Sequence, residues 1–245
     1  MKKAIIYILM ILIISIGFYI GYRQAIVGNS KQRKISKLIQ EMNNHDKIVS
    51  LDAIKALSEI KDDKTIQYLI DSLHSTDSHT RLNAARVFFY LHDIRAVEPL
   101  IATLKDDNWE VRLNVTMALG VIPDDRSIEP LINIMNSDRY SVRIQAINSL
   151  GHIKNKQAVD SLIVALQDTT FGQKWESDGI RMVAAGALGE IKDPRAVEPL
   201  IITLEDSESN IRKQASQSLK RITGQNFGQA SNMWQKWWQE NKEKI

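Results

Sequence analysis

The side chains that most often carry out catalysis or bind metals are few and scattered in this chain of 245 residues. Cys is absent, which excludes thiolate nucleophiles and thiolate metal sites. Of the histidines, only His74 and His79 are near each other, at a spacing of five that fits one helical face poorly. The others are His45, His92 and His152. The chain also lacks GxSxG, GxxxxGK[ST] and GxGxxG patterns. We therefore predict a protein that is not an enzyme, with no catalytic residue, metal site or cofactor.

The charges are divided unevenly along the chain, although the net charge is only +3. Seven basic residues precede Glu41, the first acidic residue, and without them 25 basic residues remain against 29 acidic ones. A slightly acidic body is a poor match for a phosphate backbone, which requires clustered Lys and Arg. We therefore expect no nucleic-acid partner.

The N-terminal segment is strongly apolar. Residues 4–20 contain no charge, and the uncharged run continues to residue 22, long enough for a helix to cross a bilayer. We therefore predict a single-pass anchor through residues 4–22, with residues 1–30 as anchor and short linker. A cleaved secretory signal is the alternative. The basic residues after the span favour a cytoplasmic location for the remaining chain, but the MKK start favours an extracytoplasmic one, which we expect.

The body of the chain is an internal repeat. The segments AVEPLIATLKD (96–106), SIEPLINIMNS (127–137), AVDSLIVALQD (158–168) and AVEPLIITLED (196–206) are near copies, offset by 31, 31 and 38 residues. Leucines keep this spacing at Leu69, Leu100, Leu131, Leu162 and Leu200, and Leu38 extends it backwards. A fixed period of this length is typical of stacked supersecondary units.

A second series follows each of these segments. It starts at arginines that recur with offsets of 31, 31, 38 and 31 residues: Arg81, Arg112, Arg143, Arg181 and Arg212. Apolar residues follow each Arg at three, seven and ten positions, which places them on one helical face. A residue present in every unit indicates structure, so we expect each Arg to bridge the preceding turn through carbonyls or Asp.

Each unit is therefore predicted to be two amphipathic helices, beginning at an Asp or Asn that offers its side chain to free amides. Residues 31–224 give about six such hairpins, and residues 225–245, with Trp234, Trp237 and Trp238, form a capping helix. One hairpin cannot bury its own apolar faces, so we predict an all-α right-handed solenoid.

The pattern DxRAVEPLIxxLxD…VRxxAxxALGxI resembles the HEAT-like repeat of the phycobilisome-lyase (PBS lyase) family over residues 32–223. This resemblance implies an armadillo-type α-solenoid, and its members include scaffolds, bilin lyases and the iron-dependent deoxyhypusine hydroxylase. The hydroxylase relatives bind iron through adjacent His-Glu pairs, and no His-Glu dipeptide occurs here. We therefore favour a scaffold or adaptor that binds a protein or peptide, with an enzyme of either kind as the alternative.

The candidate binding surface is the concave wall that the second helices of a repeat array present. Positions two, five and nine after each Arg lie together on the side away from the core and are rich in amides, which suit a peptide or protein partner. They are Asn83, Arg86, Tyr90, Asn114, Met117, Val121, Gln145, Asn148, His152, Val183, Gly186, Glu190, Gln214, Gln217 and Arg221. A solvated helix face is the alternative interpretation of the same pattern.

The fifth unit carries an insertion of seven residues. Residues 169–176 are expected to protrude as a loop that offers Phe171, Lys174 and Trp175 to a partner. The alternative is that the two aromatic side chains fold back onto the neighbouring unit.

Overall fold

The computed structural model describes residues 30–169 and 172–244. Within these ranges the chain forms helices joined by turns, with no strand. The chain separates into two compact units, Met1–Thr65 and Ile66–Ile245. The all-helical prediction is confirmed for the described residues.

In the first unit, residues 30–42 are helical and α2 spans Lys47–Ser58. Asp46 caps α2, since its side chain accepts hydrogen bonds from the amides of Ile48 and Val49. Because free amides at a helix start need acceptors, this cap marks where the second helix begins. Ile54 is fully buried on α2, and Ser50 Oγ donates to the carbonyl of Met42 at 2.7 Å.

The second unit begins within α3 and continues as alternating short and long helices. Their bounds are α3 Asp63–Ser72, α4 Ser78–Leu91, α5 Val97–Thr103, α6 Trp109–Val121, α7 Ile128–Ser137, α8 Tyr140–Ile153, α9 Val159–Gln167, α10 Lys174–Ile191, α11 Val197–Thr203, α12 Ser209–Thr223 and α13 Ser231–Asn241. We call α5, α7, α9 and α11 the first helices and α4, α6, α8, α10 and α12 the second helices.

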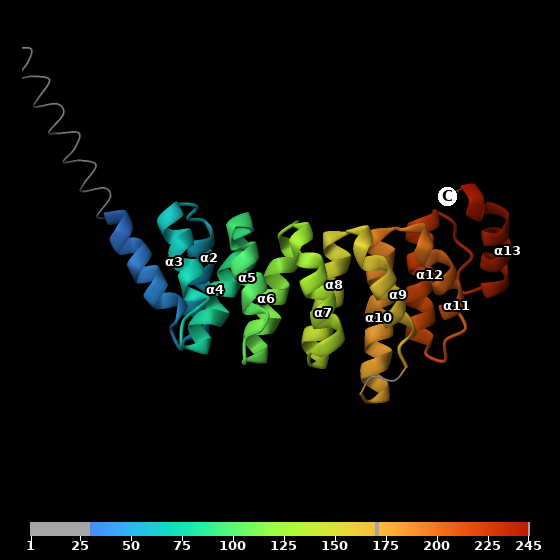
Figure 1. Cartoon of the computed structure of the whole chain (residues 1–245), viewed down its shortest axis with the longest axis horizontal. Coiled ribbons are helices and arrows are strands. Elements are labelled where there is room, and N and C mark those ends of the chain that lie inside the picture. The colour runs from blue at the N-terminus through green and yellow to red at the C-terminus, as the bar shows by residue number, and fades with distance from the viewer. Residues whose placement is uncertain (1–29, 170–171, 245) are drawn as a thin grey trace, which may run out of the picture. The chain divides into compact units, whose positions relative to one another are not determined.

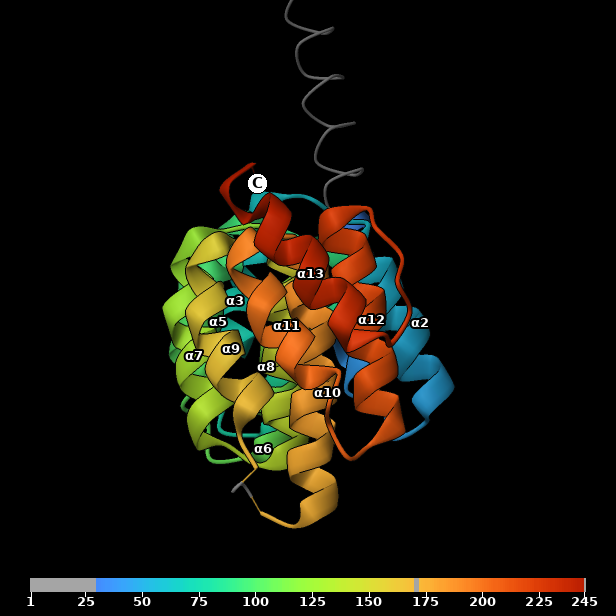
Figure 2. The ribbon, with the colours of Figure 1, turned by 90° about the vertical axis from the view of Figure 1, so that its right-hand side faces the viewer.

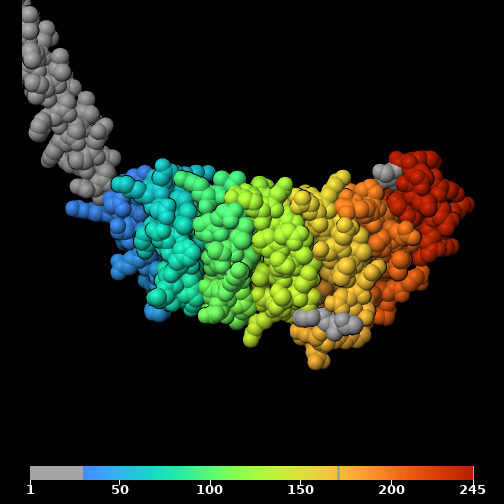
Figure 3. Space-filling model, viewed as in Figure 1, coloured from blue at the N-terminus to red at the C-terminus, as the bar shows by residue number. Residues whose placement is uncertain are grey.

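The helices of the second unit lie in two layers (Figure 1). Second helices pack directly against one another in the order α4, α6, α8, α10 and α12, and each first helix packs on the second helix that follows it. Figure 2 looks along this row, with first helices such as α9 and α11 on one side and α10 and α12 on the other. In the space-filling view, successive helix pairs form adjoining bands (Figure 3). The second unit is therefore a solenoid-like stack.

The repeated apolar positions form the core between the layers. The predicted leucines are fully buried at Leu69, Leu100, Leu131, Leu162 and Leu200. The positions three and seven residues after each Arg are also buried, from Ala84 and Phe88 to Ala215 and Leu219. The equivalent interior placement that the repeat spacing predicted is confirmed.

The start of each first helix is a short 3-10 turn that the sequence pattern did not indicate. These turns span Ile94–Ala96, Asp125–Ser127, Lys156–Ala158 and Pro194–Ala196. An acidic or amide residue precedes each turn and accepts a hydrogen bond from a backbone amide, as Asp93 does from Arg95 N at 2.9 Å. The predicted capping positions are confirmed, although the caps act on the 3-10 turn ahead of the α-helix.

The predicted membrane localisation needs correction. No helix among residues 30–169 and 172–244 is both long and apolar enough to cross a bilayer. The anchor predicted over residues 4–22 lies outside the described residues, and a single-pass anchor is not supported.

Candidate protein-binding groove

The exposed side of the second helices is hollowed into an open groove of about 690 Å³, which we call the second-helix groove. All five second helices contribute to it, from α4 to α12. Its lining residues are Phe89, Met117, Gly120, Val121, Gln145, Asn148, Ser149, His152, Met182, Val183, Gly186, Ala187, Glu190, Gln214 and Arg221. A groove that crosses several units is long enough to contact an extended segment at many points.

Close packing of neighbouring second helices gives the groove its floor. A Cβ atom on Gly120 would lie 2.3 Å from Ser149 Oγ, and one on Gly189 would lie 2.4 Å from Ser218 Oγ. Glycine has no side chain, so the backbone of α6 can lie close to α8 at Gly120. In the same way α10 can lie close to α12 at Gly189. Ser149 Oγ donates to the carbonyl of Thr116 at 2.9 Å and so joins α8 to α6.

The lining of the groove is chemically mixed. Apolar residues line it near α4 and α6, with Phe89 and Met117, and again on α10, with Met182 and Val183. Arg221 donates from Nη1 to Glu190 Oε1 at 2.6 Å, and both side chains are 45 % exposed. Such an exposed pair contributes little to stability and remains open to exchange with charges on a partner.

Amide side chains also line the groove, on α8 and α12. Gln145 and Gln214 each donate weakly to the serine four residues later, at 3.3 and 3.5 Å. An amide carries both donors and an acceptor, so these groups retain hydrogen-bonding capacity for peptide backbone or polar side chains.

The structure brings together part of the candidate set. Met117, Gln145, Asn148, His152 and Glu190 all line the second-helix groove. Five further positions of the predicted binding surface line it as well: Val121, Val183, Gly186, Gln214 and Arg221.

Other candidates lie outside the groove. Asn114 donates to the carbonyl of Glu110 on its own helix at 2.8 Å, and Arg86 is half-buried. Tyr90 is 42 % exposed but does not line the groove, where Phe89 stands instead. Asn83 is fully buried, so its prediction as a surface contact is wrong. In this unit the residue two positions after the Arg therefore faces the core and not the surface.

Sequence reasoning missed Phe89, Gly120, Ser149, Met182 and Ala187. A signal for the floor was present in the repeat itself. Glycines occur eight residues after Arg112, Arg143 and Arg181, and small residues occur six after Arg143, Arg181 and Arg212. Small residues that recur at fixed offsets on facing helices indicate close backbone approach.

The last part of the insertion in the fifth unit, from Lys174, is helical where a loop was expected. Lys174 and Trp175 lie in the first turn of α10, which is 18 residues long, so the loop prediction is wrong for these two residues. Trp175 is 61 % exposed, and its ring meets Tyr140 of α8 edge-on at 5.0 Å. Lys174 is paired with Asp178 and Glu208. Phe171 lies outside the described residues.

The repeated arginines hold the second helices in register. Arg112 donates from Nη1 to the carbonyls of Asp106 and Asp107 and forms two hydrogen bonds with Asp138, at 2.5 and 2.7 Å. Arg81 and Asp106 make the same arrangement one unit earlier. The predicted contact with carbonyls of the preceding turn is confirmed at Arg81, Arg112 and Arg212. At Arg81, Arg112 and Arg181 the arginine also binds a carboxylate of the following unit. Each bridge therefore fixes one hairpin to the next.

Paired helices, a buried leucine row and a groove along the second layer define a helical-repeat protein. Family models match as HEAT repeats over residues 97–174 and as a PBS lyase HEAT-like repeat over residues 180–206. Residues 97–174 and 180–206 therefore carry HEAT-like repeats of this family.

Solved structures support the same fold. The complex of CpcE and CpcF of phycocyanin lyase from Nostoc sp. PCC7120 is 25 % identical over 65 % of each chain, with a TM-score of 0.54. An engineered protein is 22 % identical over 78 % of this chain and 96 % of its own, with a TM-score of 0.53. A designed armadillo repeat protein in complex with the peptide (KR)4 is 17 % identical over 76 % and 98 %, with a TM-score of 0.50. A comparison with curated protein sequences finds no match.

Proposed function

We propose that this chain is a non-catalytic scaffold that binds an extended segment of a protein partner in the second-helix groove. The observation that carries the proposal is the groove itself, which crosses five helices and is lined by apolar side chains, amides and an exposed ion pair. An extended peptide presents side chains and backbone groups at regular spacing, and this mixed lining complements such a ligand.

The closely packed floor also supports this proposal. Because Gly120 and Gly189 fix the distance between neighbouring helices, the lining side chains are held on rigid elements. A site that is already formed loses less conformational entropy on binding than a flexible one.

A lyase-type enzyme is the second candidate, favoured by the 25 % identity to the CpcE and CpcF complex of phycocyanin lyase. It predicts that the purified chain takes up a bilin and gains visible absorbance. The hydroxylase alternative predicts bound iron, which elemental analysis measures. Either result would replace the non-catalytic proposal.

A displayed random peptide library, selected against the full chain, tests the scaffold proposal. Gly186 lies in the groove, where an added Cβ would be 3.4 Å from the flexible Gln214 side chain. Gly186→Phe should fill the groove and abolish binding of the selected peptides, whereas Gly186→Ala should retain it. Both variants should unfold at the same temperature. Peptides that bind the Phe variant as tightly as the unmodified chain, or a selection that yields none, would refute the groove as the binding site.

A further inference from the structure

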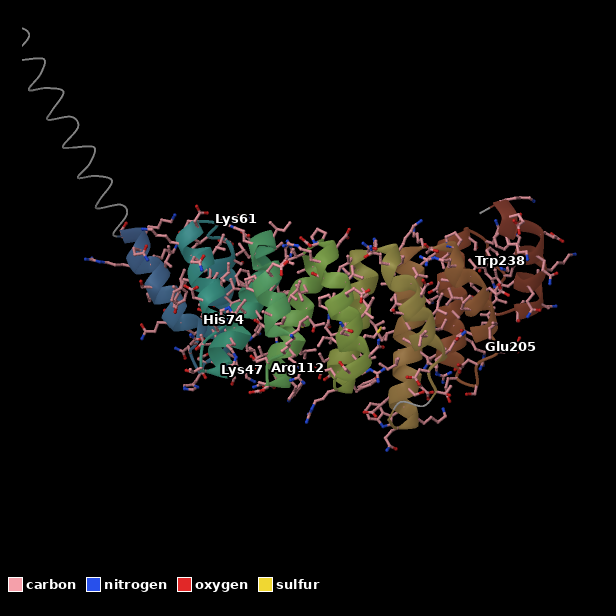
Figure 4. All side chains as sticks on the ribbon, viewed as in Figure 1. Lys47, Lys61, His74, Arg112, Glu205 and Trp238 are labelled. Atoms are coloured by element: carbon pink, nitrogen blue, oxygen red, sulfur yellow. The ribbon has the colours of Figure 1, made fainter. Side chains whose placement is uncertain are left out.

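A second hollow, of about 850 Å³, opens between the first helices α5 and α7, and we call it the first-helix pocket. It is formed by Ile101 of α5 and the residues just after this helix, by one face of α7 from Pro130 to Ser137, and by Arg112 near the start of α6, which is labelled in Figure 4. None of its lining residues lines the second-helix groove. Its volume falls in the range of small-molecule sites.

The pocket lies where the repeat departs from its own pattern. Asp106 closes the segment 96–106, but the equivalent position in the segment 127–137 is Ser137. The carboxylate lies one residue later, at Asp138. Arg112 and its partner Asp138 are therefore 26 residues apart in the sequence, whereas Arg81 and Asp106 are 25 apart. The helix changes with it, since α7 continues to Ser137, 10 residues in all, whereas α5 has 7. The extra turn of α7 forms one wall of the pocket.

The lower part of the pocket is apolar. Ile101 and Leu104 contribute from the α5 side, and Pro130 and Ile134 from α7. Leu104 is almost fully buried, while Ile101 and Ile134 are half-buried. These side chains suit an apolar body such as an aromatic ring or a short alkyl chain, because burying it removes apolar surface from water.

The mouth of the pocket carries an excess of positive charge. Three cations line it, Lys105, Arg112 and Arg139, against the carboxylates Asp106 and Asp138. Both carboxylates already bind an arginine, Asp106 with Arg81 and Asp138 with Arg112. Two exposed cations therefore remain at the mouth, Lys105 and Arg139.

Arg139 is held in place before any ligand arrives. Its guanidinium carbon lies 5.8 Å from the centre of the Trp109 ring, a cation–π arrangement. Arg139 also occupies the N-cap position of α8, which Asp77 and Asn108 occupy in α4 and α6. The side chains of Asp77 and Asn108 cap their helices, but that of Arg139 does not and instead lines the pocket. Residues that break a local structural rule in this way are often found at functional sites.

We propose that the first-helix pocket binds a small organic anion, with its apolar body between α5 and α7 and one carboxylate group between Lys105 and Arg139. The two cations provide charge-assisted hydrogen bonds, and Arg139 offers the planar fork that matches a carboxylate. This site is separate from the second-helix groove, because no residue lines both, although α6 contributes to each.

A matched set of probes tests the proposal on the full chain: 4-phenylbutyrate, its neutral amide and 4-phenylbutylamine. These share the apolar body and differ in the charge of the head group. Ligand-observed saturation-transfer NMR should give a dissociation constant for the carboxylate that is about five- to tenfold lower than that for the amide, as expected for two partly exposed ion pairs. The amine should bind more weakly than the amide, and added salt should reduce the preference for the carboxylate.

Three variants locate the binding. Lys105→Gln combined with Arg139→Gln should make carboxylate and amide bind equally, whereas Lys213→Gln, an exposed lysine on α12, should change nothing. Ile134→Trp should fill the pocket and weaken all three probes, with peptide binding in the second-helix groove unaffected. Thermal unfolding of each variant verifies folding. No measurable carboxylate binding, equal affinity for carboxylate and amine, or an unchanged preference in the folded double variant would overturn the proposal.

Discussion

Arg81 and Asp106, which belong to successive units, are joined by two hydrogen bonds, from Nε to Oδ2 at 2.5 Å and from Nη2 to Oδ1 at 2.9 Å. Their side chains are 16 % and 6 % exposed, so solvent screens the pair only weakly. Arg112 and Asp138 repeat the arrangement in the next unit. The solenoid therefore gains from each such bridge a specific link between hairpins, in addition to its continuous apolar core.

Removing the carboxylate of Asp106 should destabilise the second unit. Asp106→Ala leaves the largely buried guanidinium of Arg81 without its main partner, and breaking a buried pair on one side costs about 3 kcal/mol. The neighbouring Asp107 is exposed, so Asp107→Ala should stay within about 0.5 kcal/mol of the unmodified chain. Urea unfolding measures both values. Equal stabilities for the two variants would show that the bridge contributes nothing specific.

The same bridges make stability depend on pH in the acid range. Burial alone would raise the pKa of Asp106, but hydrogen bonds from Arg81 and the Asn108 amide outweigh it and hold that pKa below its usual value. Burial opposes the lowering at Asp138 too, where Arg112 and the Arg139 amide depress the pKa.

A carboxyl group whose pKa is lower in the folded state binds its proton more readily when unfolded. The resulting stability is present above the unfolded pKa of about 4 and disappears as pH falls through the folded value. The unfolding temperature should therefore drop steeply from about pH 5 downwards. Asp106→Asn should show a shallower drop, and an identical slope would exclude Asp106 as one of the groups responsible.

The repeat spacing predicted the core because burial in a stacked hairpin array is strictly periodic. Because each hairpin covers the next, Leu69, Leu131 and Leu200 face the same kind of interior contact, and each is fully buried. The structural role of the arginines was predictable for the same reason, because similar adjacent hairpins make similar contacts along the stack. The membrane anchor had no such support, because it rested on one apolar run alone.

The repeat could not predict features that belong to a single unit. Helical spacing places Asn83 and Gln145 at equivalent positions, yet Asn83 is buried and Gln145 lines the groove. Trp175 was expected in a loop, but it lies in the first turn of α10. The pairing of Arg112 with Asp138 follows a one-residue shift in the sequence, but the structure was needed to show that this carboxylate binds the Arg of the preceding unit.

Enlarging Gly120 should disturb the contact between α6 and α8. The new Cβ atom of Gly120→Ala would lie 2.3 Å from Ser149 Oγ and 2.6 Å from its Cβ, so a core shift costing about 1–3 kcal/mol is expected. Gly186→Ala is the matched control, because its Cβ would meet the flexible Gln214 side chain at 3.4 Å. Adding Ser149→Gly to Gly120→Ala should recover part of the loss. Thermal unfolding that fails to separate the two alanine variants would contradict this account of the groove floor.

Two tryptophans should respond differently to the same truncation. Trp234 on α13 is fully buried, donates from Nε1 to the carbonyl of Gly228 at 2.9 Å and meets Phe227 edge-on at 4.9 Å. Trp234→Ala should therefore cost about 3–5 kcal/mol and release α13 from α11. Trp175 is 61 % exposed and contacts one ring, so Trp175→Ala should cost only about 0.5–1.5 kcal/mol. Urea unfolding gives the stabilities, and hydrogen exchange of α11 amides reports the release. A larger loss for Trp175 than for Trp234 would mean that the start of α10, and not α13, secures the C-terminal half of the stack.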